Sequence, residues 1–497
     1  MTKQTLSKST FVRGLQCEKS LYLYKHHYKL KDVPSESLQA IFSQGTAVGL
    51  LAQELFPGGV DASPENHFEM AASVAKTKNF IATGETVIYE ATFKFDEVMV
   101  ALDILVKDAD GWKAYEVKSS TKVSDTYIKD AAIQFYTLVN AGIDLKDISI
   151  VFINNQYVKN GALDVKNLFK ITSVFNEVHA LLPTIPSQIS RLKAVIAQDT
   201  IPAIDIGLHC DTPYSCDFKG YCWQHIPDYS IFNIARLKAP DKFALYKEGI
   251  VSFDQIDLTT KTFNASQEIQ IRAEQKQESI IDKARIKAFL STLDYPLYYL
   301  DFETMGPAVP IYDNTHPYQQ MVFQYSLHVQ ESPDSAVLHY DYLAEADQSI
   351  DPRDNFVKQI IKDCGTKGDI LVYNIGFERG KLNDLKILYP QYQNEIQALI
   401  NRLKDLMIPF QQKWYYTPEM KGSYSIKYVL PALVPELSYK DLEIQNGGTA
   451  SSLFLEMVTG HYKGAIQKTR EDLLAYCQLD TWAMVKILEV LKNLINF

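Results

Sequence analysis

Four acidic residues in the C-terminal part of the chain are of the type that can hold divalent metal ions. Asp301 and Glu303 follow an apolar run, and Glu378 follows a second such run. Asp480 comes four residues after Tyr476 in the tract YCQLD. Converging carboxylates repel one another unless cations lie between them, and Mg²⁺ or Mn²⁺ prefer oxygen ligands. Two such ions could clamp the attacking and leaving oxygens of a phosphodiester, and Tyr476 could hydrogen-bond the attacking water.

Three elements, far apart in the sequence, must position these side chains. Residues 297–300 predict a strand, and the two acids after it, at i and i+2, share one face of that strand. Residues 369–374 predict a second strand, followed by a turn and a helix that carries the third acid. The C-terminal tract 473–494 predicts an amphipathic helix, on which the tyrosine and the last acid lie one turn apart. The alternative interpretation is that these acids merely end a strand and solvate a helix.

The order D-x-E, N-x-x-F-E, Y-x-x-x-D resembles the DEDD exonucleases of the DnaQ-like, RNase H-like superfamily, in their tyrosine subtype. The resemblance covers residues 295–497. It implies removal of nucleotides from a 3′ end, with two metal ions. The second motif carries glutamate where aspartate is usual, and the longer side chain should still reach a cation but shift the metal geometry. The implied ligands are Asp301, Glu303, Glu378 and Asp480, with Tyr476 as the tyrosine that orients water.

A second set of candidate residues lies in the N-terminal part of the chain. Residues 98–107 and 112–120 alternate as strands do and are joined by the turn DADG, which predicts a hairpin. Glu116 and Lys118, at i and i+2, point to the same side, and the adjacent strand would bring Asp103 within reach of them. Two carboxylates can hold a divalent cation, and a lysine can stabilise a phosphoryl transition state. A surface ion pair would have the same sequence.

A predicted helix at 124–142 follows this hairpin and carries Gln134 and Tyr136. Together these motifs resemble the RecB-type branch of the PD-(D/E)XK nucleases. That branch often has a metal-binding histidine on an early helix, but the matching stretch, QGTAVGLLAQELF, has none, and Glu54 or Glu90 could substitute. The resemblance implies a second hydrolytic centre, with divalent metal at Asp103 and Glu116 and catalytic roles for Lys118 and Gln134.

Three of the six cysteines, Cys210, Cys216 and Cys222, are evenly spaced with five residues between neighbours. They lie in a polar stretch rich in turn residues, which would place three thiolates on one compact loop. Such a loop can hold a metal ion or an iron–sulfur cluster, provided that a fourth ligand closes the site. Cys17 is the candidate for that ligand. The other interpretation is that these are reduced structural thiols.

Zinc usually binds cysteine pairs that are two to four residues apart, so this wider spacing argues mildly against it. His209 and His225 flank the loop and could supply a nitrogen ligand, which keeps zinc as the alternative. In one group of RecB-type nucleases, a cysteine before the nuclease core and three after it clamp a [4Fe–4S] cluster. The four cysteines match that order, although the last three are more widely spaced than in the commonest version. The resemblance therefore favours a [4Fe–4S] cluster.

The length and composition predict a globular protein of about three domains, and the pattern of elements together with the two resemblances implies an α/β fold class. The chain has 497 residues, of which 46% are hydrophobic and 22% are charged, and no apolar stretch is long enough for a membrane helix. We therefore expect a cytoplasmic protein without a membrane partner. Its net charge of −10 provides no overall basic field that would attract nucleic acid. The segments are a PD-(D/E)XK-like domain with the cysteines at 1–229, a helical linker or module at 230–294, and the DnaQ-like domain at 295–497.

Taken together, the chain resembles a bacterial family of unknown cellular role that joins an iron–sulfur RecB-type nuclease domain to a DnaQ-like exonuclease domain. We expect a metal-dependent nuclease that acts on single strands or frayed ends, with DNA as the expected substrate. Lysines and aromatics alternate in the stretch 413–430, as they do on surfaces that bind single strands, although such aromatics more often form a core. Two alternatives stay open. Either only the C-terminal half cleaves while the N-terminal half grips DNA, or the protein is a binding or assembly subunit with inactive nuclease folds.

Overall fold

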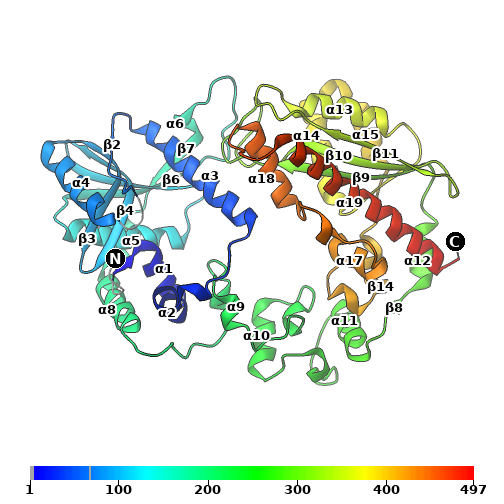
Figure 1. Ribbon diagram of the computed structural model, residues 1–497, viewed down its shortest axis with the longest axis horizontal. Helices are drawn as coiled ribbons and strands as arrows, with labels where there is room; N and C mark the ends of the chain where they lie inside the picture. The colour runs from blue at the N-terminus through cyan, green and yellow to red at the C-terminus, as the bar shows by residue number, and fades with distance from the viewer. Residues whose placement is uncertain (1–4, 66–68, 497) are drawn as a thin grey trace. The chain divides into compact units, whose positions relative to one another are not determined.

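A computed structural model describes residues 5–65 and 69–496 (Figure 1). The fold is mixed α/β, as the sequence predicts, and the chain forms two compact units. Unit 1 contains the residues up to His225 together with Ala308–Tyr318. Unit 2 contains Ile226–Pro307 and the residues from Gln319 onward. The sequence prediction placed the first boundary at 229 and kept 295–497 together.

Unit 1 is built on a mixed sheet of seven strands. The predicted hairpin is formed by β4 (Val98–Asp108) and β5 (Gly111–Lys118), which pair antiparallel. The next strand, β6, runs parallel to β5, so a crossover must join them, and helix α5 (Asp125–Asn140) supplies it. The sheet order is β2-β3-β4-β5-β6-β7, with β1 paired to β4. The other strands are β1 (Leu6–Ser7), β2 (Val60–Asp61), β3 (Val87–Phe95), β6 (Leu145–Ile153) and β7 (Phe169–Ser173).

Helices pack on both faces of this sheet, which explains why its strands are largely apolar. One core is formed with α5 and the terminal helices of the unit, and contains Phe11, Leu102 and Leu192, each fully buried. The other core packs α3 against the opposite face through Val48 and Ala52. The helices of unit 1 are α1 (Lys8–Gln16), α2 (Glu18–His26), α3 (Glu36–Ala52), α4 (Met70–Thr83), α5, α6 (Val165–Leu168), α7 (Phe175–Leu181), α8 (Ile185–Ile196) and α9 (Lys219–Cys222).

The segment Ala308–Tyr318 belongs to unit 1 although its neighbours in the sequence belong to unit 2. Ala308 is buried in the second core of unit 1. Asp313 forms an ion pair with Lys159, at 2.9 Å between Oδ1 and Nζ. The Tyr318 hydroxyl donates a hydrogen bond to the backbone carbonyl of Ser119, just after the end of β5. Apolar, ionic and hydrogen-bonding contacts thus hold this segment to unit 1.

Unit 2 contains a five-stranded mixed sheet of order β11-β10-β9-β12-β13. The central strand, β9 (Leu297–Met305), pairs antiparallel with β10 (Met321–Gln330) and parallel with β12 (Asp369–Val372). The outer strands are β11 (Val337–Leu343) and β13 (Leu403–Asp405). Strand β9 is buried along nearly its whole length because helices cover both of its faces.

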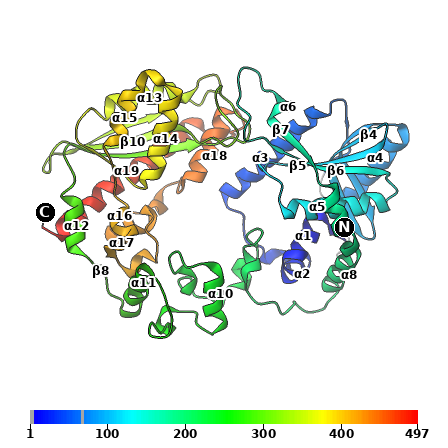
Figure 2. The same ribbon diagram turned by 180° about the vertical axis from the view of Figure 1, so that it is seen from behind.

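The helices of unit 2 pack in two layers on this sheet (Figures 1 and 2). Helices α13 (Pro352–Asp363), α14 (Ile375–Leu388) and α15 (Gln393–Asn401) share a core with β9, β10 and β12. Helices α18 (Gly447–Val458) and α19 (Ile466–Leu494) contact β9 as well, and α19 also contacts α17 (Ile426–Leu433). The long α19 includes the predicted C-terminal helix and begins before it.

The segment between the two sheets is helical, as predicted, and forms its own small core within unit 2. Ile231, Leu245, Phe253 and Ile271 are buried there. Its helices are α10 (Ala239–Lys247), α11 (Ala265–Lys276) and α12 (Lys283–Leu290). Its short strand β8 (Ile280–Ile281) pairs with β14 (Tyr415–Tyr416) from later in the chain. The short helix α16 (Ile408–Gln411) lies just before β14 in the sequence. Across residues 5–65 and 69–496, no helix has both the length and the apolar character needed to cross a bilayer.

Candidate functional site

Three of the predicted acids meet in unit 2. Asp301 and Glu303 lie on one face of β9, and Asp480 comes from α19, which packs on that face. One carboxylate oxygen from each residue lies within 4.8 Å of the other two. Glu303 and Asp480 are 7% and 6% exposed, and Asp301 is partly exposed. In the described part of the chain, no other group of three or more His, Cys, Asp or Glu ligand atoms is this compact.

Burial raises the pKa of every member of this acidic triad, and repulsion from neighbouring carboxylates adds to the shift at Asp301 and Glu303. Burial, Asp480 and Glu303 all raise the pKa of Asp301 well above its ordinary value. Burial and Asp480 raise the pKa of Glu303 to about 8. Burial also raises the pKa of Asp480 to about 6, against the effect of neighbouring hydrogen bonds and a nearby lysine. None of the three carboxylates forms an ion pair within the described residues. The ionised forms of these carboxyl groups are therefore disfavoured, and no ammonium group among the described residues is in contact to stabilise them.

Glu378, the fourth predicted acid, lies in the first turn of α14 and outside the compact triad. Its side chain is 2% exposed, and its Oε2 atom has no hydrogen-bond partner within residues 5–65 and 69–496. Burial raises its pKa to about 8, with a smaller contribution from Asp405. Its charge also raises the pKa of Asp301. Among the described residues, Glu378 is therefore a buried acid without a compensating partner, within electrostatic range of Asp301.

Tyr476, the predicted water-orienting residue, is buried next to the triad on α19. Hydrogen bonds from Tyr439 and Tyr476 favour the ionised form of Asp480, and the Tyr439 hydroxyl lies 2.6 Å from Oδ1 of Asp480. Burial raises the pKa of both tyrosines far above the ordinary value, so their hydroxyl groups remain protonated donors. Cys477 also contacts the triad, with its Sγ 3.8 Å from Oδ2 of Asp301.

Lys427, on α17, is a site residue that the motif analysis did not single out. Its Nζ lies 5.0 Å from the ring centroid of Tyr476 and 5.3 Å from that of Tyr439. Burial lowers its pKa, although Asp480 and Glu303 act in the opposite direction. Lys427 falls within the stretch 413–430, which the sequence predicts to bind single-stranded nucleic acid. The sequence spacing does not indicate that a residue of this stretch lies near an acid on α19. The structure places one cation at the edge of the triad, without direct contact to it.

In unit 1, Glu116 is at the centre of a different arrangement. Its Oε1 atom accepts hydrogen bonds from two lysines, Lys8 at 2.5 Å and Lys118 at 2.7 Å. Its Oε2 atom accepts one from the side-chain amide of Gln134 at 3.0 Å. Lys118 also forms an ion pair with Asp130 at 2.7 Å. Lys8 and Asp130 were not identified from the sequence.

Asp103 lies beside this cluster because the register that pairs Ile104 with Tyr115 places it at the level of Glu116. Its Oδ2 accepts a hydrogen bond from the backbone N–H of Val117 at 2.6 Å. Burial and the charge of Glu116 raise the pKa of Asp103 to about 7. The two lysines oppose this shift.

The two candidate substitutes for the missing histidine lie in different environments. Glu90 lies on β3, opposite β4, and its backbone is left-handed, with φ of 54°. Burial raises the pKa of Glu90, and the charge of Glu116 raises it further. Glu54 is exposed on a short 3₁₀ turn. Tyr136 packs edge-on against Phe95 and has no contact with the carboxylates among the described interactions. Glu90 is therefore the nearer of the two to the unit 1 cluster.

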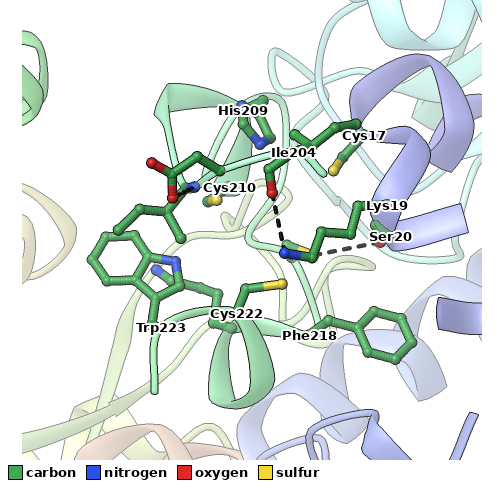
Figure 3. A pocket seen from close by; sticks show the side chains of 13 residues that line it. Cys17, Lys19, Ser20, Ile204, His209, Cys210, Phe218, Cys222 and Trp223 are labelled. Carbon is green, nitrogen blue, oxygen red and sulfur yellow. Dashed lines mark hydrogen bonds between the residues drawn. The ribbon is translucent and has the colours of Figure 1, made fainter. Parts of the chain in front are cut away.

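The four predicted cysteine ligands line one cavity of unit 1 (Figure 3). They are Cys17, at the junction of α1 and α2, and Cys210, Cys216 and Cys222 from the loop around α9. All four are free thiols. Lys19 also reaches the cavity and donates a hydrogen bond to the Ile204 carbonyl at 3.1 Å.

The separation of the sulfur atoms bears on the zinc alternative. Zinc–sulfur bonds of about 2.3 Å in a tetrahedron hold the sulfur atoms about 4 Å apart. Within the described residues, no three of these sulfur atoms come within 4.8 Å of one another. His209 lines the cavity, whereas His225 is not among its lining residues. The donor set is thiol-rich and wider than a single tetrahedral ion requires.

Comparison with known proteins identifies relatives without an assigned activity. A family model described as a domain of unknown function (DUF2779) matches residues 298–425, which include the first three acids of the C-terminal site but not Asp480. The uncharacterized protein UU173 of Ureaplasma parvum is 27% identical over 224 residues, covering 40% of this chain and 31% of that protein. The uncharacterized protein MG366 homolog of Mycoplasma pneumoniae is 28% identical over 245 residues, covering 46% and 36%. The matches span about a third of the length of these relatives.

Proposed function

We propose that the protein is a metal-dependent nuclease whose hydrolytic site is the triad of Asp301, Glu303 and Asp480. The observation that carries this proposal is the compactness of three largely buried carboxylates that have no ion-pair partner among the described residues. Three such groups within 4.8 Å are costly unless cations neutralise them. Hard divalent cations are the ions that oxygen ligands of this kind select.

The order of these residues in the sequence and the class of the fold support the same function. The motifs resemble those of the tyrosine-type DEDD exonucleases. A mixed sheet with two acids on its central strand, covered by a helix that carries a third, fits the RNase H-like fold that the resemblance implies. The mixed sheet of unit 1, with a helix crossing between the parallel strands β5 and β6, likewise fits a PD-(D/E)XK class.

The triad would hold Mg²⁺ or Mn²⁺, and Glu378 is the fourth carboxylate at hand. Bound divalent ions supply charge stabilisation for a phosphodiester under attack and lower the pKa of water. Tyr476 is protonated and buried beside Asp480, so its hydroxyl can hold a water molecule by hydrogen bonding. Lys427 places a positive charge next to both tyrosines, where it can stabilise negative charge on a phosphate.

The expected substrate is the 3′ end of a single strand, with DNA preferred. The lysines and aromatics of 413–430 divide between core and surface, since Tyr416 is buried while Tyr428 is 46% exposed. Tyr428 follows Lys427 on α17, so this helix carries an exposed ring one residue after a lysine whose ammonium group lies near Tyr476. Rings and cations of this kind stack on bases and contact phosphates.

Cleavage of end-labelled nucleic acid tests the proposal directly. The full chain with Mn²⁺ should shorten a 5′-labelled single strand stepwise from its 3′ end, and chelation should stop the reaction. The variants D301N and D480N should each remove cleavage while the protein stays folded. The matched control is D472N, since Asp472 lies on the same helix as Asp480 but pairs with Lys468 away from the triad. Binding without cleavage under these conditions would refute the proposal and favour a nucleic-acid-binding or assembly subunit.

We also propose that Cys17, Cys210, Cys216 and Cys222 hold a [4Fe–4S] cluster. Four free thiols that line one cavity at wider separation than zinc needs support this choice. Such a cluster would tie the start of unit 1 to its end and restrict the unfolded chain. Iron and acid-labile sulfide in protein purified without oxygen, lost in C216S, would support it. A colourless protein that contains stoichiometric zinc would contradict it.

A further inference from the structure

Both side-chain oxygens of Glu116 in unit 1 are already engaged by hydrogen-bond donors. Oε1 accepts from the ammonium groups of Lys8 and Lys118, and Oε2 accepts from the Gln134 amide. Glu116 is 1% exposed, so water does not compete for these positions. A divalent ion at Glu116 would have to displace at least one of these donors.

The partner carboxylate is engaged through one of its two oxygens. Asp103 uses Oδ2 to accept the Val117 N–H at 2.6 Å. Asp130 is bound to Lys118. Two ammonium groups thus balance most of the charge of three acids, which is what a divalent cation would otherwise do. An ammonium group at 2.5 Å from Glu116 Oε1 would also repel a metal ion bound to the same oxygen.

Strand pairing and helix capping at the start of unit 1 place Lys8 next to Glu116. Its neighbours Leu6 and Ser7 form β1, which pairs with Val98 and Met99 of β4, the strand that carries Asp103. Ser7 then caps α1, where it exchanges hydrogen bonds with Thr10. Leu6 is fully buried on one side of Lys8. The backbone at Lys8 is therefore fixed by strand pairing and helix capping, and its side chain has a short path to Glu116.

We infer that Lys8 is the resident cation of the unit 1 site, where it takes the place of a divalent metal and keeps that site from hydrolysing phosphodiesters. The residues do not fit the metal centre that the PD-(D/E)XK resemblance implies, because every oxygen of Glu116 is bound to a donor. The inference is independent of the proposed exonuclease, since it concerns only the groups of unit 1. It also identifies a latent metal site, which removal of one ammonium group would expose.

Mn²⁺ binding to the full chain tests this inference without relying on activity. The measurements use a D301N/D480N background, so that the unit 2 triad does not take the ion. With Lys8 present, calorimetry and electron paramagnetic resonance should detect no Mn²⁺ that depends on Glu116. The variant K8M, which keeps the length and removes the charge, should gain a Mn²⁺ ion per chain. The added E116Q substitution should abolish that gain.

Two controls separate the role of charge from general effects. K8R keeps a cation near Glu116 and should gain no Mn²⁺. K29M removes an exposed lysine outside the cluster and should also gain none. Melting curves show whether each variant is folded.

The inference is overturned if the Lys8-containing protein binds Mn²⁺ and E116Q removes that binding. It is also overturned if folded K8M gains no ion. Should K8M not fold, the comparison of the Lys8-containing protein with and without E116Q still decides, because Glu116-dependent binding there contradicts the inference and its absence supports it.

Discussion

The two carboxylate clusters of this protein differ in what neutralises them. In unit 2, the acids of β9 and α19 lie within 4.8 Å of one another and form no ion pair among the described residues, while Lys427 lies against the ring of Tyr476. In unit 1, Glu116 contacts two lysines and an amide. The pKa values differ in the same way, since those of the triad are raised whereas that of Glu116 is held well below its ordinary range by Lys118 and Lys8 despite burial. Similar residue types thus form a triad with no ion-pair partner among the described residues and a cluster whose central carboxylate is paired with two lysines.

The largest expected contrast is in cleavage. Loss of one triad ligand in D480N should reduce turnover on the order of a thousandfold, because bound metal supplies several kcal/mol of transition-state stabilisation. The substitution E116Q in unit 1 should leave turnover within about twofold of that of the unsubstituted protein. Loss of a catalytic group would reduce turnover far more. Both are measured as initial rates on the same 5′-labelled strand with Mn²⁺. A large loss in E116Q would show that unit 1 also hydrolyses and would remove the contrast.

A smaller contrast is expected in the pH dependence of stability. The folded-state pKa values of about 8 for Glu303 and about 6 for Asp480 lie above the ordinary values near 4. Raised carboxyl pKa values mean that the folded state binds more protons, so these groups favour folding most below about pH 4, and their contribution falls as the pH rises through 6 to 8. The melting temperature of chelator-treated protein should therefore decrease from pH 6 to pH 8.

Mn²⁺ should reverse that decrease because it competes with protons for the same oxygens. At one hundred times its Kd, a ligand adds about 2.7 kcal/mol of stability. The stabilisation should be larger at pH 8 than at pH 6 and absent in D301N/D480N. Differential scanning fluorimetry at both pH values measures it. An equal Mn²⁺ shift at pH 6 and pH 8 would indicate that the ion binds elsewhere.

The smallest expected effect concerns Lys427 and has opposite signs in two measurements. K427Q removes a positive charge from the edge of the triad, so Mn²⁺ should bind a few-fold more tightly. Turnover should nevertheless fall about tenfold, which corresponds to about 1.4 kcal/mol of lost stabilisation of negative charge on the phosphate. K427R should retain most of the activity. Calorimetry and kcat measured separately from KM distinguish these effects, and weaker Mn²⁺ binding in K427Q would contradict the assigned role.

The sequence predicts the local elements of both sites well, because their signals are local. The alternation in β4 and β5, the crossover helix α5 and the apolar run before Asp301 all correspond to observed elements. The i and i+2 spacing places Asp301 and Glu303 on one face, which follows from strand geometry alone. Their position next to Asp480 depends on how α19 packs on the sheet. The order of the motifs suggests that packing, but the spacing of residues within each motif does not determine it.

The residues that sequence reasoning missed are those that reach a site from a distant element. Lys8 contacts Glu116 across 108 positions of the chain, and the cause is the pairing of a two-residue strand with β4. No periodicity marks so short a strand. Lys427 stands in a stretch noted for its lysines and aromatics, yet nothing local distinguishes it from Lys421. Charge compensation is a property of tertiary contacts, so the difference between the two clusters could not be read from the motifs.

The segment Ala308–Tyr318 has a consequence for how the gene can be divided. The polypeptide passes between the two units three times, after His225, after Pro307 and after Tyr318. A fission of the gene at any single point between the two sheets would deprive the first product of Ala308, which is 4% exposed, and of the Asp313 partner of Lys159. Two separate genes could therefore not encode the halves without rebuilding this interlaced connection.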